Sequence, residues 1–262
     1  MRNLSVQNED EPPVVDDVSF DVAAGEIVAI AGVQGNGQSE LSEALVGLRP
    51  ATGSVQLDGN ELNGRSPKQI LRAGVGYVPE DRQHDGLVSA FSVAENLILD
   101  QYDAPPFAKG VQTQPRRIRQ NADTLIAEFD IRTGSAETAV GTLSGGNQQK
   151  VVVGRELSKS LRLLIASQPT RGVDVGSTEA IHKRIVEVRD SGVGVIIVSS
   201  ELDEVLALAD RIAVMYRGRI VGILPAGASR DELGLMMSGA SQEKAHEESI
   251  AHPTEISAAE ES

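Results

Sequence analysis

The sequence contains no cysteine and no tryptophan, and aromatic residues make up only 3% of its 262 residues. Without cysteine the chain has no disulfide framework, no thiolate metal site and no cysteine nucleophile. No apolar run approaches the roughly 18 residues that a membrane-spanning helix needs, and the N-terminus lacks a signal-peptide pattern. These absences agree with a cytosolic protein, and any membrane connection would have to run through another protein.

Positive charge is also scarce, with 24 basic against 38 acidic side chains and a formal net charge of −14. This balance argues against a nucleic-acid or lipid surface as a direct partner. Residues 240–262 hold six glutamates against one lysine and almost no large apolar side chains. We therefore expect a folded domain over residues 1–238 and an acidic disordered tail over residues 239–262. A solvated extension without function is the simplest interpretation of this tail.

The most informative stretch of the sequence covers residues 26–41. Its apolar run Ile27–Ala31 predicts a buried strand, a glycine-rich turn follows, and the apolar spacing of residues 40–48 predicts a helix. In such an arrangement, successive backbone N–H groups and the helix N-terminus converge on an anion. The phosphate-loop pattern G-x-x-x-x-G-K-[ST] matches residues 32–39 at every fixed position except one. The candidate phosphate-binding residues are Gly32, Gly35, Asn36, Gly37, Gln38, Ser39 and Glu40.

Gln38 stands where the phosphate-loop pattern has lysine. A glutamine amide can donate a hydrogen bond to a phosphate oxygen, but it carries no positive charge. Hydrogen bonds to charged groups contribute about 1.5–3 kcal/mol, against about 1 kcal/mol for neutral ones. We therefore expect nucleotide binding to be roughly tenfold weaker than with lysine. The alternative interpretation is a strand-to-helix turn whose glycines serve tight packing only.

Strand and helix signals alternate along the chain and predict an α/β fold with an antiparallel edge sheet and a mostly parallel core sheet. At the N-terminal end, residues 14–22 read as a strand paired with the phosphate-loop strand. Residues 90–140 carry helical patterns and few strand signals, which predicts a helical subdomain. In the final third, apolar runs cover residues 161–166, 193–198 and 212–215, and helical patterns cover residues 177–189 and 201–209.

A second helix N-terminus that could bind an anion is predicted at Ser144, which precedes two glycines and a helical pattern running to about Leu157. The octapeptide Leu-Ser-Gly-Gly-Asn-Gln-Gln-Lys at residues 143–150 is the signature motif of ATP-binding-cassette (ABC) transporter ATPases. The chain resembles this family over roughly residues 4–237, and the resemblance implies an ABC-type P-loop NTPase fold. The other segments that carry it are residues 76–82, 168–176 and 198–205.

The chain departs from the family pattern where the family keeps its catalytic groups. The Asp-Glu pair that supports magnesium and polarises the attacking water reads Ser167-Gln168 here, and the switch histidine is Ser200. Glu80 replaces the glutamine that contacts magnesium and water, and no aromatic residue between residues 4 and 18 could stack on adenine. Phosphoryl transfer relies on the loop lysine, the metal with its carboxylate and a water-orienting base. We therefore expect no catalytic residue to be intact and no hydrolysis by the isolated domain.

The signature motif, by contrast, is intact. In this family two domains pair head to tail, and each ATP lies between the phosphate loop of one domain and the signature of the other. The resemblance implies that the signature residues of this chain contact an ATP held by the partner domain. These residues are Ser144, Gly145, Gly146, Asn147 and Gln148. Asp174 matches the family position that crosses the interface, and a helix-capping aspartate is the alternative interpretation.

The cofactors implied by the resemblance are ATP and, weakly at the chain's own site, magnesium with Ser39 and Glu80 as ligands. The chain looks like the second, degenerate half of fused two-cassette subunits that drive importers of nucleosides or simple sugars. The sugar branch more often retains the Asp-Glu pair, which favours nucleosides. The resemblance implies a peripheral place on the cytoplasmic side of the cell membrane, with residues 80–99 lining a groove for membrane-spanning partners. The implied partners are a second nucleotide-binding domain (fused or separate), transmembrane permease subunits and, indirectly, a solute-binding protein, with no nucleic acid.

Two other functions stay open. The first is a binding-only regulatory cassette that senses nucleotide without powering transport. The second is a soluble ABC protein of the repair or translation type. The negative net charge, the lack of a basic face and the absence of a long coiled-coil insertion disfavour the second.

Overall fold

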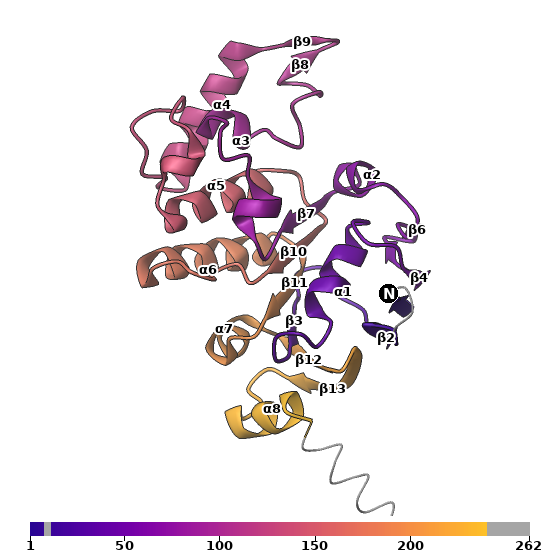
Figure 1. The fold of residues 1–262 in the computed structure, drawn as a ribbon. Coiled ribbons are helices and arrows are strands. Elements are labelled where there is room, and N and C mark those ends of the chain that lie inside the picture. Colours follow the sequence, from indigo (N-terminus) through magenta and orange to yellow (C-terminus); the bar gives the residue numbers. More distant parts are fainter. Residues whose placement is uncertain (8–11, 240–262) are drawn as a thin grey trace, which may run out of the picture.

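A six-stranded sheet with helices on both faces forms the centre of the molecule (Figure 1). The computed structural model describes residues 1–7 and 12–239, so the expected acidic tail lies outside the described residues except for Gly239. All neighbouring strands of this sheet run parallel, except that β12 and β13 are antiparallel. The predicted α/β class with a mostly parallel core is confirmed. In spatial order the strands are β13 (Arg219–Pro225), β12 (Arg211–Tyr216), β3 (Ile27–Ala31), β11 (Gly194–Ser199), β10 (Leu163–Ser167) and β7 (Val75–Val78).

The central strands are apolar along their whole length because both faces of the sheet are covered. On β11, Val195 and Ile197 point into one apolar cluster, while Ile196 and Val198 point into the cluster on the opposite face. This alternation follows from the two-residue period of a strand. It explains why these strands appear in the sequence as continuous apolar runs.

The N-terminal strands form a separate three-stranded antiparallel sheet in the order β2 (Val15–Val18), β1 (Arg2–Val6) and β4 (Thr52–Ser54). The expected pairing of residues 14–22 with the phosphate-loop strand is wrong, because β2 pairs with β1 through Leu4 opposite Val18. β11 and β12 already occupy the two edges of β3, so β3 has no edge left for β2. The helix α1 (Gln38–Leu45) contacts strands of both sheets and joins them into one core.

The helical patterns predicted within residues 90–140, after Ser144, and at residues 177–189 and 201–209 are confirmed. They form α3 (Val93–Asn96), α4 (Pro115–Glu128), α5 (Gly145–Leu157), α6 (Val175–Asp190) and α7 (Leu202–Leu208). The helix α2 (Pro67–Arg72) precedes β7. A further helix, α8 (Arg230–Met237), was not expected. Its signal is Ser229, whose side chain caps the helix by accepting a hydrogen bond from the Glu232 backbone N–H at 3.1 Å.

Short elements fill the connections between the larger ones. They are two-residue strand pairs β5 (Gln56–Leu57) with β6 (Asn60–Glu61) and β8 (Ala108–Lys109) with β9 (Gln112–Thr113), a π-helical turn at Arg82–Gly86 and a 3₁₀ turn at Val140–Thr142.

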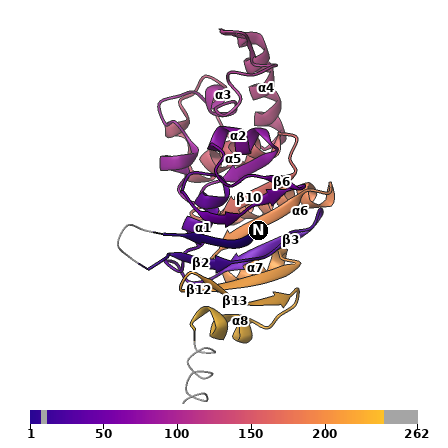
Figure 2. The ribbon, with the colours of Figure 1, turned by 90° about the vertical axis from the view of Figure 1, so that its right-hand side faces the viewer.

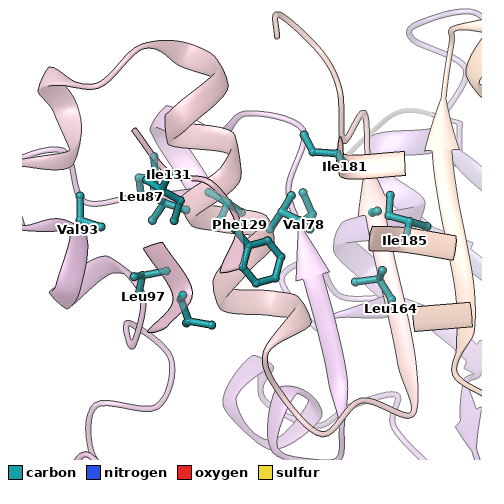
Figure 3. Packing of buried hydrophobic residues seen from close by; sticks show 14 of the residues in the cluster. Val78, Leu87, Val93, Leu97, Phe129, Ile131, Leu164, Ile181 and Ile185 are labelled. Carbon is teal, nitrogen blue, oxygen red and sulfur yellow. The ribbon is translucent and has the colours of Figure 1, made fainter. Parts of the chain in front are cut away.

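The helices α3 and α4 lie at one end of the molecule and α8 at the other (Figures 1 and 2). Phe129, which follows α4, lies between residues of α3 and residues of the central sheet (Figure 3). Gly154 of α5 makes room for this ring, since a Cβ atom there would lie 3.3 Å from it. The helical region around residues 90–140 therefore shares one apolar cluster with the sheet.

None of the helices within residues 1–7 and 12–239 combines the length and the apolar character that crossing a bilayer requires.

Candidate functional site

The glycine-rich loop after β3 requires glycine at position 37. Gly37 has a φ of 99°, and a Cβ atom there would lie 2.3 Å from the carbonyl oxygen of Val14. Asn36 ties the loop to the turn between β12 and β13. Its side-chain oxygen accepts from the Arg217 N–H at 3.0 Å, and its carbonyl accepts from the Gly218 N–H at 2.9 Å. The loop is therefore fixed at its base, while Gly35 at its tip has open space around it.

Gln38, Ser39 and Glu40 form the first turn of α1, whose leading N–H groups have no partner within the helix. Gln38 is 5% exposed, and its amide lies against the loop, since a Cβ atom on Gly32 would lie 2.6 Å from Nε2. The positive end of the helix dipole favours an anion at this place. The loop thus offers backbone donors and a neutral amide to a phosphate group, and it lacks a cation of its own.

Glu80 faces this helix start from the end of β7. The Ser39 hydroxyl donates to Glu80 Oε2 at 2.6 Å, and Arg171 forms an ion pair with Glu80 Oε1. Arg82 holds the backbone next to this pair by donating from Nη1 to the carbonyl oxygen of Arg171 at 2.7 Å. Both carboxylate oxygens of Glu80 therefore have partners already.

Gln168 and Ser200, which the sequence predicts at two of the family's catalytic positions, contact each other. Gln168 has a φ of 47°, and its Nε2 donates to the Ser200 hydroxyl at 3.1 Å. Ser167 is 1% exposed at the end of β10. A pocket of about 270 Å³ lies here, and it is lined by Gln34, Glu80, Gln168, Thr170, Arg171, Gly172, Ser200 and Glu201. Gln168, Ser200 and Ser167 bring no carboxylate to it.

The donors around Ser39 fit a phosphate group but not a dedicated magnesium site. Magnesium in proteins is held by one or two carboxylates together with substrate phosphates. Among the described residues no group of three or more His, Asp or Glu side chains could hold a metal ion. Glu80 is the carboxylate that Ser39 contacts, and its two oxygens are bound by Ser39 and Arg171.

The signature segment begins α5 on the surface of the molecule. Ser144 is the N-cap residue, but its hydroxyl accepts from Asn147 Nδ2 at 2.9 Å and makes no capping bond. Gln148 is buried and donates to the carbonyl oxygens of Val140 at 3.3 Å and Leu143 at 3.2 Å. Ser144 is therefore exposed at a helix terminus that buried neighbours hold in place.

The two signature glycines pack against groups from other elements. A Cβ atom on Gly145 would lie 2.6 Å from Arg82 Nη2, and one on Gly146 would lie 2.9 Å from Asp174 Oδ2. Arg82 also donates to Arg171, so one side chain touches both the signature and the loop that follows β10. The Glu80 pocket and the signature are thus joined through Arg82.

Asp174 caps α6, as the alternative interpretation of the sequence had it. Its carboxylate accepts from the Ser177 N–H at 3.0 Å and from the Ser177 hydroxyl at 2.9 Å. The backbone hydrogen bond from Ser177 lowers the pKa of Asp174 below its usual value. The next residue, Val175, is 76% exposed.

The loop after β10 is supported from behind by Glu204, which is 4% exposed. Its Oε1 accepts from Thr170 Oγ1 at 2.8 Å and lies 2.9 Å from His182 Nε2. Burial raises the pKa of Glu204, but hydrogen bonds from His182, Ser199 and Thr170 outweigh burial and leave the pKa lowered. Sequence reasoning assigned no role to Glu204, Arg82 or Arg171. The sequence feature that could have indicated these three residues is their charge within the segments that resemble the ABC family.

The sequence profile of the ABC transporter family matches residues 15–171. The match covers more than half of the chain, which therefore belongs to the ABC transporter family. The chain is an ABC transporter ATP-binding domain related to the ATPases of nucleoside and sugar importers.

Two relatives illustrate this relation. The guanosine import ATP-binding protein NupO of Bacillus subtilis (strain 168) is 45% identical over 88% of this chain and 46% of that protein. The nucleoside import ATP-binding protein NupA of Lactococcus lactis subsp. cremoris (strain MG1363) is 44% identical over 91% of this chain and 48% of that protein. The chain thus spans about half the length of the curated relatives it matches.

Solved structures of ATP-binding cassettes share the fold. A dimeric post-hydrolysis structure of the cassette MJ0796 with ADP and phosphate superposes with a TM-score of 0.75 at 20% identity. It covers 87% of this chain and 98% of that chain. At this identity the likeness concerns the fold alone, and the expected ABC-type fold is confirmed.

Proposed function

We propose that this chain is the ATP-binding domain of an importer for nucleosides or simple sugars. Its own phosphate site is degenerate, and its signature motif completes the ATP site of a partner domain. The observation that carries the proposal is the exposed start of α5, where Ser144 lies at a helix terminus next to Gly145. A helix N-terminus on the surface can donate its free N–H groups to a phosphate that another molecule holds.

In this proposal the chain's own loop binds the phosphates of ATP. Ser39 and Glu80 are the residues that would hold magnesium there, but Glu80 is already paired with Arg171. This site lacks the groups that hydrolysis needs. Ser167, Gln168 and Ser200 cannot act as the metal-supporting carboxylate, the base or the switch histidine. The ATP-binding residues are Gly32, Gly35, Asn36, Gly37, Gln38, Ser39 and Glu40.

The partner is a second nucleotide-binding domain, fused or separate, that carries an intact lysine and carboxylates. Ser144, Gly145, Gly146, Asn147 and Gln148 would close over its ATP. Asp174 would cross the same interface in addition to capping α6. Val175, next in the chain, is 76% exposed and would lie at the same interface.

Transmembrane permease subunits would dock in a pocket between the helical region and the core. This pocket has a volume of about 200 Å³, and its lining includes Leu48, Pro79, Asp85 and Leu99. Asp85 and Leu99 belong to the span that the sequence assigned to this groove. The chain would then work peripherally on the cytoplasmic face of the membrane, with a solute-binding protein as an indirect partner. The importers to which the relatives belong support nucleosides or simple sugars as the cargo.

Mixing the chain with a cassette that has an intact site tests the proposal. The purified chain alone should show no ATP hydrolysis above background, because its own site lacks the catalytic groups. Addition of the partner cassette should give hydrolysis above the partner's own rate. That gain should be lost with Ser144→Ala and retained with Ser191→Ala, a control at the exposed end of α6.

Two results would contradict this proposal. The first is a steady-state turnover by the chain alone that Ser39→Ala abolishes. The second is nucleotide binding with no effect of the partner, which would favour the regulatory cassette that only senses nucleotide.

A further inference from the structure

We infer that Arg171 takes the place of a divalent cation at this chain's own site, so that a nucleoside triphosphate binds there without magnesium. The inference rests on the proposed function, because it requires the loop to bind phosphate. It starts from the mismatch between the family's metal and the residues around Ser39.

The carboxylate that could reach a metal at Ser39 already has a partner on each oxygen. Glu80 Oε2 accepts from the Ser39 hydroxyl at 2.6 Å, and Glu80 Oε1 is paired with Arg171. A magnesium ion would have to compete with both partners, and magnesium demands near-ideal octahedral geometry and loses its waters reluctantly. Arg171 is always charged and is already in contact with the carboxylate. Its attachment to the chain gives it an advantage of proximity over an ion from solution.

The backbone that carries Arg171 is fixed at the rim of the pocket. Arg82 Nη1 donates to the Arg171 carbonyl at 2.7 Å, and the Arg171 N–H donates to the Gln168 carbonyl at 3.0 Å. The same pocket is lined by Gln34 of the phosphate loop and by Arg171. The guanidinium thus lies in the space that adjoins the loop. Its five N–H donors allow it to pair with Glu80 and with a phosphate oxygen together.

The charge balance of the pocket explains why such a cation is needed. Glu80 and Glu201 both line the pocket, and Arg171 is the basic residue among its lining residues. Gln38 contributes no charge from the loop. Without Arg171, an arriving phosphate would meet the Glu80 carboxylate across Ser39, and like charges at this range repel. A metal ion would then be required to bridge the two.

Calorimetric titration of ATP into the full chain, with excess magnesium and with EDTA, tests the inference. The wild-type affinity should agree within about threefold between the two buffers. Arg171→Gln should bind about tenfold more weakly in EDTA and should recover with magnesium, because the freed Glu80 then becomes a metal ligand. Arg171→Gln/Glu80→Gln should lose this dependence on magnesium, because it lacks the carboxylate. Arg116→Gln, an exposed arginine on α4, is the matched control and should behave as wild type.

The same titrations in a Gln38→Lys background bring weak binding into the measurable range. A wild-type affinity that falls tenfold or more in EDTA overturns the inference, as does an Arg171→Gln variant whose binding is the same in both buffers. In either case the loop still binds phosphate and the proposed function stands. Absence of ATP binding in every variant, including Gln38→Lys, overturns the proposed phosphate site and the inference with it.

Discussion

At the scale of single residues, Gln38 and Glu80 set the charge around the glycine-rich loop, since Gln38 is neutral and Glu80 is a carboxylate. The missing lysine at Gln38 is visible in the sequence, because the glycines around it set the register of the pattern. The pairing of Glu80 with Arg171 is not, since 91 positions separate the two residues along the chain. Only the parallel order of β7 and β10 brings their ends together. Single-residue losses could thus be predicted from a motif, whereas the contact between Glu80 and Arg171 required the fold.

Gln38→Lys tests whether the loop lacks only a charge. We expect ATP affinity to increase roughly tenfold, because a charged donor replaces a neutral one at a phosphate. Isothermal titration calorimetry measures this directly. Gln120→Lys, which adds the same charge on an exposed part of α4, should leave the affinity unchanged. Equal affinities of wild type and Gln38→Lys would mean that the loop is not shaped for phosphate.

At the scale of single elements, the sequence predicted most strands and helices but not which strands pair with each other. The strands β10, β11 and β12 are recognisable because burial on both faces leaves them continuously apolar. The pairing of β2 was predicted wrongly, because a turn at Ala24-Gly25 fits a hairpin locally while distant strands take the edges of β3. Pairing is a property of the whole sheet and is not encoded in one turn.

The helix-capping role of Asp174 at the start of α6 can be tested through stability. Asp174→Ala should lower the free energy of unfolding by about 1 kcal/mol, because the cap on Ser177 is lost. Asp174→Asn should be close to wild type, since asparagine caps equally well. Urea unfolding followed by circular dichroism provides the comparison. Equal stability of all three proteins would mean that the cap contributes nothing.

Across the whole molecule, α5 connects the helical region to the sheet through buried charges. Glu156 accepts from Arg155 Nε at 2.8 Å, from Lys159 Nζ at 2.5 Å and from the Tyr77 backbone N–H of β7 at 3.0 Å. Arg155 also donates to the carbonyl oxygen of Gly86 at 2.8 Å. Burial raises the pKa of Glu156, but the charges of Lys159 and Arg155 outweigh burial and leave the pKa below its usual 4.5.

Glu156→Gln should destabilise the protein by about 3–5 kcal/mol at pH 7, because buried Arg155 loses its counter-charge and Lys159 keeps only its ion pair with Asp100. The folded-state pKa of Glu156 is depressed. Its contribution is therefore fully present above pH 4.5 and is lost as the pH falls below 4.5 through the folded-state value. The difference between wild type and variant should accordingly shrink in acid. Urea unfolding at pH 7 and in acid measures it, with the exposed Glu179→Gln as control. A difference that grows in acid would contradict this assignment.

The attachment of Asn36 to the β12–β13 turn has a kinetic consequence. A loop that is held at its base needs little rearrangement there before a ligand enters, so we expect association at ordinary diffusional rates. Added charge in the loop would then lengthen the lifetime of the complex more than it would speed its formation.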